Sequence, residues 1–195
     1  MIHKEKRVRF AFILAAIGLL GGCETVDKVK DVFADPIVLA CPENRILADA
    51  AEIIRYADGG GRDLTDVDTE GKILNMGLAC LTRIDKKSLV GVMEVEVNFY
   101  FEGVRGPANR NQKAQYPYFI SVTDLNKKVL YREQFNVAVD FSGNRSKLGF
   151  RSDPITLELP LRAELTGKNY LIYGGFVLTR EQLEHNRLRR RQQIR

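Results

Sequence analysis

The chain has 195 residues, of which 45% are hydrophobic and 28% are charged. This length suits one domain with short appendages, and this composition excludes collagen-like, low-complexity and wholly disordered chains. The formal charge is +5, but removal of residues 1–22 would leave +2, and residues 180–195 alone carry +4. The body of the chain is therefore close to neutral, which argues against nucleic-acid binding.

Residues 1–22 have the features of a bacterial secretion signal. A basic stretch (Lys4, Lys6, Arg7 and Arg9) precedes the apolar run 10–20, and two glycines follow before Cys23. The apolar run is too short for a permanent membrane span, which needs about 20 residues. We therefore expect residues 1–22 to be removed as a signal peptide.

The tetrad Leu20-Gly21-Gly22-Cys23 resembles the lipobox of bacterial lipoproteins. The resemblance implies that Cys23 becomes the mature N-terminus and carries acyl chains such as palmitate. Two or three such chains would hold the protein on a membrane without spanning it. Glu24 follows the cysteine, whereas in these families an aspartate there often causes retention in the inner membrane. We therefore expect an outer-membrane protein that faces the periplasm.

Once Cys23 is lipidated, Cys41 and Cys80 remain as an even pair in a compartment that oxidises thiols. We predict a disulfide between them, with two buried free thiols as the alternative. A disulfide across this separation of 39 residues would stabilise the fold by roughly 4 kcal/mol. The pair lacks CxxC spacing, so we predict neither a metal site nor a cofactor.

The segment that follows Cys23 does not predict a single kind of secondary structure throughout. Residues 23–36 mix charged residues with valines and end at a proline, so we expect a tether. Residues 46–57 fit both a helix with one apolar stripe and an alternating strand. Residues 59–61 are glycines and predict a turn, and residues 72–83 predict a strand. The side chains expected on the inner face of that strand are Leu74, Met76, Leu78, Cys80 and Thr82.

Alternation of apolar and polar residues is clearest over residues 92–102. Further strands are predicted at 116–123, 128–139, 155–161 and 170–178, and a helix is predicted from Thr179, with Gln182 completing a capping box. These elements predict an all-β fold, an immunoglobulin- or fibronectin-like antiparallel β-sandwich over residues 37–179. A short basic helical tail would follow at 180–195. The strand topology is left open.

Three further runs, RDLTDV at 62–67, RGPA at 105–108 and FVLTREQLEHNR at 176–187, resemble uncharacterised proteobacterial envelope lipoproteins. The resemblance extends over residues 41–187 and includes the cysteine-proline pair that begins this region. It implies an outer-membrane lipoprotein with a β-sandwich domain and brings no established activity. It also favours a strand over a helix for residues 46–56.

The motifs of common enzymes are missing from the sequence. It contains no GxSxG, HExxH, Walker A or GxGxxG pattern, and His185 is the only histidine after residue 22. Residues 66–71 imitate a calcium loop, but Gly77 stands where a bidentate carboxylate is needed, so we expect a solvated acidic turn. A hydrolase that uses Glu94 and Glu96 is the weakest alternative. We therefore predict a protein that is not an enzyme.

Basic residues are the candidate partner-binding groups. They lie in the tail and in the expected loop 103–115, and they are Arg187, Arg189, Arg190, Arg191, Arg195, Arg105 and Arg110. We favour a lipid-anchored interaction or structural module whose tail contacts an anionic partner, namely an envelope protein, peptidoglycan or anionic lipid. The tail could instead be a frayed, solvated end.

A second functional hypothesis is a chaperone-like lipoprotein that holds a peptide or a glycan through its end loops or an open sheet edge. Tyr116 and Tyr118 fit a platform that stacks on a sugar, but they also fit the core. An apolar groove in the structure would favour this hypothesis.

Overall fold

The computed structural model describes residues 39–59 and 61–193. The chain divides into residues 1–36 and 37–195, and the described residues all belong to the second unit. The predicted signal peptide, Cys23 and the tether therefore lie outside the described residues.

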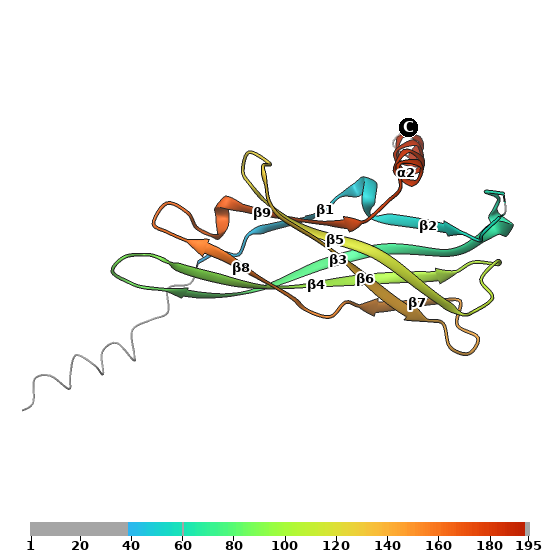
Figure 1. Ribbon diagram of the computed structural model, residues 1–195, viewed down its shortest axis with the longest axis horizontal. Helices are drawn as coiled ribbons and strands as arrows, with labels where there is room; N and C mark the ends of the chain where they lie inside the picture. Colours follow the sequence, from blue (N-terminus) through green and yellow to red (C-terminus); the bar gives the residue numbers. More distant parts are fainter. Residues whose placement is uncertain (1–38, 60, 194–195) are drawn as a thin grey trace, which may run out of the picture. The chain divides into compact units, whose positions relative to one another are not determined.

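Over the described residues, nine strands form two sheets, which confirms the predicted all-β sandwich (Figure 1). One sheet has the order β1-β9-β5-β6, and the other has the order β2-β3-β4-β7, with β8 also paired to β4. The strands are β1 (Glu43–Ile46), β2 (Glu52–Tyr56), β3 (Val67–Ile84), β4 (Gly91–Arg105), β5 (Lys113–Asp124), β6 (Val129–Asp140), β7 (Lys147–Arg151), β8 (Ile155–Leu161) and β9 (Tyr170–Phe176).

The alternating strand β4 supplies the centre of the core, as predicted. Its inward side chains, Met93, Val95, Val97, Phe99 and Phe101, are at most 1% exposed. The rings of Phe99 and Phe101 lie 5.1 and 5.2 Å from the ring of Tyr118 on β5, so aromatic contacts join the two sheets. Tyr116 and Tyr118 are both buried, and the core alternative is therefore the correct one for this pair.

Strand β3 differs from the prediction in its start and in its inner face. It begins at Val67, so most of the expected acidic turn 66–71 is strand, and Val67 and Thr69 are buried. A register shift between Ile73 and Asn75 then moves the buried side chains from odd to even positions. Ile73 is consequently buried, and the prediction that Leu74 faces inward is wrong because its side chain is 53% exposed.

Residues 46–57 form neither one helix nor one strand. The chain follows β1, makes the short 3₁₀ helix η1 (Ala48–Ala50), and continues as β2. Strand β1 pairs in parallel with β9, whereas β2 pairs antiparallel with β3 in the other sheet. The sequence was ambiguous here because the chain crosses from one sheet to the other within a few residues.

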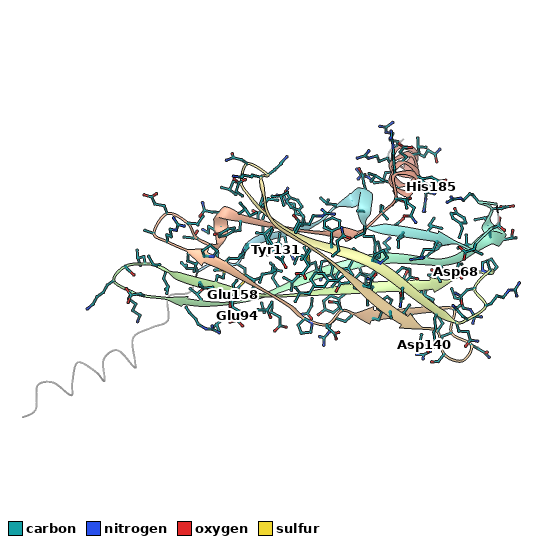
Figure 2. The ribbon with its side chains drawn as sticks, viewed as in Figure 1. Asp68, Glu94, Tyr131, Asp140, Glu158 and His185 are labelled. Carbon is teal, nitrogen blue, oxygen red and sulfur yellow. A yellow bond between two sulfur atoms is a disulfide. The ribbon has the colours of Figure 1, made fainter. Side chains whose placement is uncertain are left out.

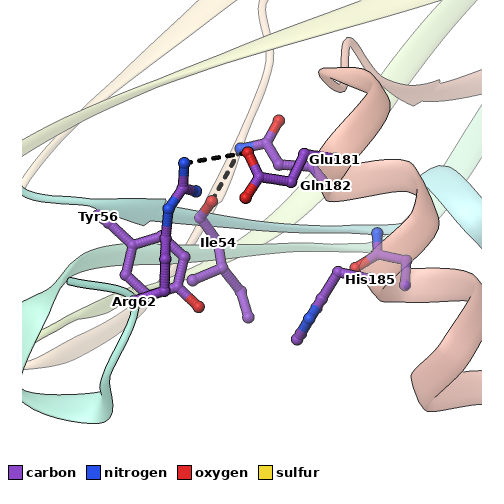
Figure 3. Close-up of a pocket in the computed structure, with 7 residues that line it drawn as sticks. Ile54, Tyr56, Arg62, Glu181, Gln182 and His185 are labelled. Atoms are coloured by element: carbon purple, nitrogen blue, oxygen red, sulfur yellow. Dashed lines mark hydrogen bonds and ion pairs between the residues drawn. The ribbon is translucent and has the colours of Figure 1, made fainter.

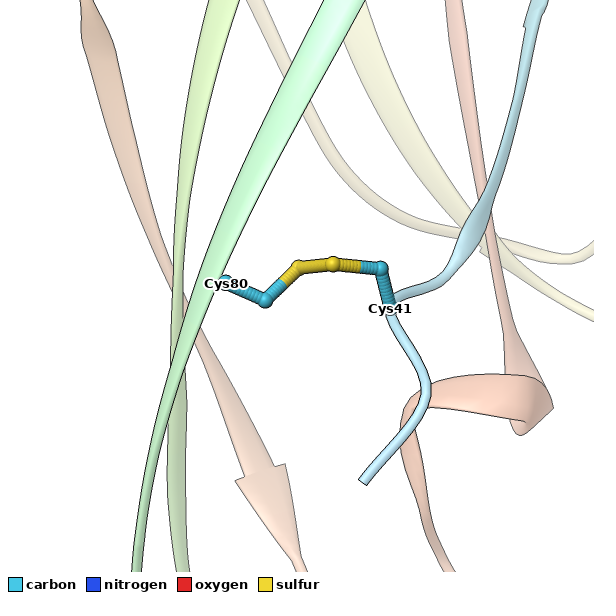
Figure 4. Close-up of a disulfide and its surroundings, with 2 residues drawn as sticks. All are labelled: Cys41 and Cys80. Atoms are coloured by element: carbon cyan, nitrogen blue, oxygen red, sulfur yellow. A yellow bond between two sulfur atoms is a disulfide. The ribbon is translucent and has the colours of Figure 1, made fainter. Parts of the chain in front are cut away.

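The predicted disulfide between Cys41 and Cys80 is confirmed (Figure 4). Its S–S distance is 2.01 Å and its Cα–Cα distance is 5.9 Å. Cys41 precedes β1 of one sheet and Cys80 lies in β3 of the other. The disulfide therefore links the two sheets near the point where the described chain begins.

The loops gather at two ends of the sandwich. Gly91 pairs with Leu161, and Tyr170 pairs with Asp124, so the loops 85–90, 124–128 and 162–169 lie toward the same end of the sandwich, which we call the hairpin end. The loops 57–66, 106–112 and 141–146 lie at the opposite end, called the far end here. The backbone N–H groups of Gly106 and Arg105 there donate to the carbonyls of Asp68 and Ser146.

Among the described residues, no helix is long and apolar enough to cross a membrane.

Candidate functional site

Helix α2 (Arg180–Gln193) begins at the capping box that the sequence predicts. The backbone N–H of Gln182 donates to Oγ1 of Thr179 at 3.2 Å, and the backbone N–H of Thr179 donates to Oε1 of Gln182 at 2.9 Å. Two N–H groups that a helix leaves without partners are thereby satisfied. Residues 180–193 form one helix.

Polar contacts fix α2 on η1 and β2. Asn186 is 8% exposed, and its Nδ2 donates to the carbonyls of Asp49 at 3.0 Å and Glu52 at 2.8 Å. Nε2 of Gln182 donates to the carbonyl of Ile54 at 2.8 Å. Loss of a buried hydrogen-bonding group of this kind leaves its partners unsatisfied, which lowers the free energy of unfolding by about 1–3 kcal/mol. The helix is therefore held in one orientation against the sandwich.

Three of the tail arginines face carboxylates of η1 and β2. Nε of Arg187 lies 3.1 Å from Oδ2 of Asp49, and Arg190 binds the other oxygen of the same carboxylate. Nη1 of Arg189 lies 3.6 Å from Oε2 of Glu52. Half-exposed pairs of this kind add little stability, typically below about 1 kcal/mol. They do place two guanidinium groups on a single carboxylate.

The predicted basic residues fall into two groups. The tail residues lie on α2, where Arg191 is exposed, and Arg195 lies outside the described residues. Arg105 ends β4 and Arg110 lies in the far-end loop 106–112, so the structure does not bring them to α2. That loop is also shorter than the expected 103–115, because β4 and β5 extend into it.

A groove of about 400 Å³ lies between α2, η1 and the strands β5 and β9. Apolar side chains form most of its lining, namely Leu47, Ala48, Ala50, Phe119, Phe176, Val177, Leu178 and Leu183. Its charged residues are Arg132, Arg187, Arg190 and Asp49, with a formal sum of +2. The guanidinium carbon of Arg132 lies 3.8 Å from the ring centroid of Phe119. The groove thus combines an apolar lining with a surplus of positive charge.

A smaller pocket of about 140 Å³ lies between α2 and β2 (Figure 3). Its wall includes the ion pair of Arg62 with Glu181 at 3.0 Å, and the guanidinium of Arg62 lies 5.2 Å from the ring centroid of Tyr56. His185 also lines the pocket, but its lining contains no serine, threonine or cysteine. The histidine therefore has no neighbouring nucleophile of the hydrolase type in this pocket.

Carboxylates lie on the outer face of β4. Glu94 pairs across the sheet with Glu158 of β8, as Figure 2 shows, and Arg83 forms an ion pair with Glu94. Glu96 lies opposite Thr156 on the same face. Within the described residues, no group of three or more His, Cys, Asp or Glu side chains could hold a metal ion.

A third cavity lies along the open edge of the sandwich. Strand β6 pairs only with β5 among the described strands. Residues of β6 and of the segment that joins β7 to β8 line a common cleft. The cleft between them measures about 770 Å³ and includes the apolar side chains of Phe135, Val137 and Ile155. Asn136, Arg151 and Asp153 add polar groups.

No protein-family model matches the chain, and neither a curated protein nor a solved structure is significantly similar to it. The groove must therefore be interpreted from its own chemistry. The sequence predicted Arg187 and Arg190 as binding residues but missed Arg132 and Phe119. For Arg132 the sequence offers only a basic residue next to apolar residues in β6, and this pattern does not reveal which helix will lie beside it.

Proposed function

We propose that this chain is a lipid-anchored, periplasm-facing envelope protein that acts as a non-enzymatic binding module. Its binding site is the groove beside α2, and its ligand combines an apolar body with a carboxylate or phosphate group. The observation that carries this proposal is the set of three arginines around an apolar lining, with only Asp49 to balance them.

The charge arrangement supports an anionic ligand. Arg187 and Arg190 share one carboxylate, and Arg132 stacks on a ring without an ion pair among the described contacts. An arginine can therefore turn toward a ligand while Asp49 keeps one partner. Guanidinium groups bind carboxylates and phosphates through paired hydrogen bonds. The apolar lining beneath them selects a ligand that is more than a bare ion.

The groove can be tested with 8-anilinonaphthalene-1-sulfonate, a fluorescent probe that joins aromatic rings to one anionic group. Arg132→Gln and Arg190→Gln should each weaken probe binding about tenfold, as loss of a charge-assisted hydrogen bond predicts. Arg110→Gln at the far end is the matched control and should leave the affinity unchanged. Dodecanoate should displace the probe from the unmodified protein, whereas the uncharged dodecanol should not. Equal affinity in all three variants would overturn the proposal.

The proposed localisation rests on Cys23 and on the predicted signal peptide before it. Cys23→Ser should release the protein from membranes or leave an unprocessed precursor, because the acylated side chain is removed. Membrane fractionation shows whether the variant is released, and the mass of the chain shows whether the signal peptide has been removed. A mature chain of normal size that stays on the membrane would exclude lipid anchoring through this residue.

The cleft beside β6 favours a second candidate function, the binding of an extended peptide. A peptide could pair with the open edge of β6 and place alternate side chains against Phe135 and Ile155. Asn136→Pro would remove a backbone donor from that edge strand. Crosslinking from a photoreactive residue at position 136, compared with one at exposed Leu74, would capture a peptide only in the first case.

A further inference from the structure

The hairpin end has a surface composition that the groove does not explain. Each of its loops, 85–90, 124–128 and 162–169, carries two basic residues and one carboxylate, so together they carry +3. Exposed large apolar side chains lie in the same loops and in the strand ends beside them. They are Leu81, Leu89, Val90, Val92, Leu125, Val129, Leu130 and Tyr131.

The far end differs in both respects. Its loops 57–66, 106–112 and 141–146 have charges that sum to zero. Among the described residues of those loops, Leu64 is the exposed large apolar side chain. Apolar side chains surrounded by lysines are typical of a surface that contacts anionic lipid headgroups and the acyl region beneath them.

The chain also enters the domain at the hairpin end. Glu43 pairs with Leu171, next to the start of β9, and the disulfide holds Cys41 against β3. Cys23 precedes Leu39 by sixteen residues, a segment that can span at most about 55 Å. A lipid on Cys23 would therefore keep the hairpin end within reach of the membrane surface, where even a weak contact is populated.

Leu89 supplies an independent observation at the tip of the β3–β4 hairpin. Its φ angle is 54°, in the left-handed region that favours glycine and asparagine, and its side chain is 39% exposed. Asparagine would adopt this backbone conformation at a lower cost, and about two-fifths of the leucine surface stays exposed to solvent. A residue kept in an unfavourable conformation suggests a role outside the folding of the domain.

We propose that the hairpin end docks on an anionic phospholipid surface. Leu89, Val90 and Leu125 enter the interfacial layer, and Lys87, Lys127 and Lys128 contact the lipid phosphates. The docking deepens the proposed lipid anchoring, because the anchor and the loops then hold the same end of the domain on the membrane. The groove beside α2 and the far end remain open to the periplasm.

The test uses the mature chain without its lipid, residues 24–195, secreted with an ordinary signal peptide so that the disulfide forms. Binding is measured by co-sedimentation with vesicles of phosphatidylglycerol and phosphatidylethanolamine, and with vesicles of phosphatidylcholine alone. We expect binding to the anionic vesicles only, weakening as salt rises. The double variant Lys127→Gln, Lys128→Gln should bind about 30-fold more weakly.

A double variant at the far end, Arg110→Gln with Lys113→Gln, removes the same charge and should bind like the unmodified chain. Leu89→Asn should weaken vesicle binding without lowering the melting temperature, which separates a lost contact from a lost fold. Equal losses from both ends would show that only net charge matters, and stronger losses from the far end would reverse the orientation; either result overturns the proposal. Because this chain carries no lipid, a failure here is distinguishable from a failure of Cys23 anchoring.

Discussion

At the far end of the sandwich, side chains tie the loops to the fold, whereas at the hairpin end apolar side chains stand in solvent. Nδ2 of Asn109 donates to Oδ1 of Asp68 at 2.9 Å and to the carbonyl of Lys113 at 3.0 Å. The side chains of Asp63 and Asp66 close the 3₁₀ helix η2 (Leu64–Asp66) through a capping box. The far end thus uses its polar groups within the molecule.

The hairpin end is also well formed, but by different means. Oδ1 of Asp85 accepts hydrogen bonds from the backbone of Lys87 and Ser88 and from the hydroxyl of Ser88, and these bonds lower the pKa of Asp85. The turn therefore holds its shape while Leu89 and Val90 remain exposed. A well-formed loop that exposes apolar residues is better explained by a contact with another molecule or surface than by poor packing.

The largest expected effect comes from removing the link between the two sheets. The double variant Cys41→Ser, Cys80→Ser should lower the free energy of unfolding by about 4 kcal/mol, because the unfolded chain gains the freedom of the closed loop. Urea unfolding measures this loss. In this variant the rate of amide hydrogen exchange should rise first in β1 and remain slow around Asn109. A loss below about 1 kcal/mol would mean that packing alone holds this end together.

The fold could be predicted where the sequence pattern is local. Strand β4 follows from strict alternation. The disulfide was predicted from the expectation that Cys23 is lipidated and that Cys41 and Cys80 then pair in an oxidising compartment. The inner face of β3 was predicted correctly from Met76 onward, but Leu74 was placed on the wrong face, because the register shift between Ile73 and Asn75 exchanges the two faces. Strand β7 was also missed, since its five residues are mostly exposed at a sheet edge.

The candidate site was predicted only in part, for a similar reason. The capping box of Thr179 and Gln182 is a local signal and is confirmed. The contacts of Asn186 with the carbonyls of Asp49 and Glu52 join positions more than 130 residues apart, and such pairing leaves no periodic trace. A basic helix therefore predicts a charged surface, but it does not reveal which carboxylates and apolar residues it will meet.

Alkaline pH should weaken the part of the core nearest the far end. Burial raises the pKa of Tyr116 to about 12, and its hydroxyl donates to the carbonyl of Glu70 at 2.8 Å. Because the folded pKa lies above the unfolded value of 10.0, this stabilisation is complete below pH 10 and disappears as the pH rises toward 12. A rise of about two pKa units corresponds to a loss of at most about 3 kcal/mol.

Urea unfolding at several pH values tests this prediction. Tyr116→Phe should be about 1 kcal/mol less stable than the unmodified chain at pH 8, since the hydrogen bond is lost. That difference should shrink or reverse above pH 11. Tyr100→Phe, at an exposed position of β4, is the matched control and should change neither the stability nor its pH dependence. A constant difference from pH 8 to 12 would contradict the assignment.

Asn109 gives a smaller effect and compares the two ends directly. Asn109→Ala should lower the free energy of unfolding by about 1–2 kcal/mol, because Asp68 and the carbonyl of Lys113 lose their donor. Asn126→Ala, in an exposed turn of the hairpin end, should change it by less than about 0.5 kcal/mol. Thermal unfolding of both variants measures the two losses of stability. Equal losses would show that the two ends do not differ in how they are stabilised.

The smallest expected effect is a stabilisation rather than a loss of stability, and it compares the hairpin end with the far end at matched positions. Leu89→Asn at the hairpin end and Gln112→Asn at the far end both place asparagine at a φ angle of 54° or 57°. Each should raise the free energy of unfolding by about 0.5 kcal/mol, because asparagine tolerates the left-handed region better than either residue it replaces. Only the first variant should lose binding to anionic vesicles. If Leu89→Asn instead destabilised the domain, the leucine would be explained by packing at the hairpin tip, and its exposure would no longer argue for a contact outside the fold.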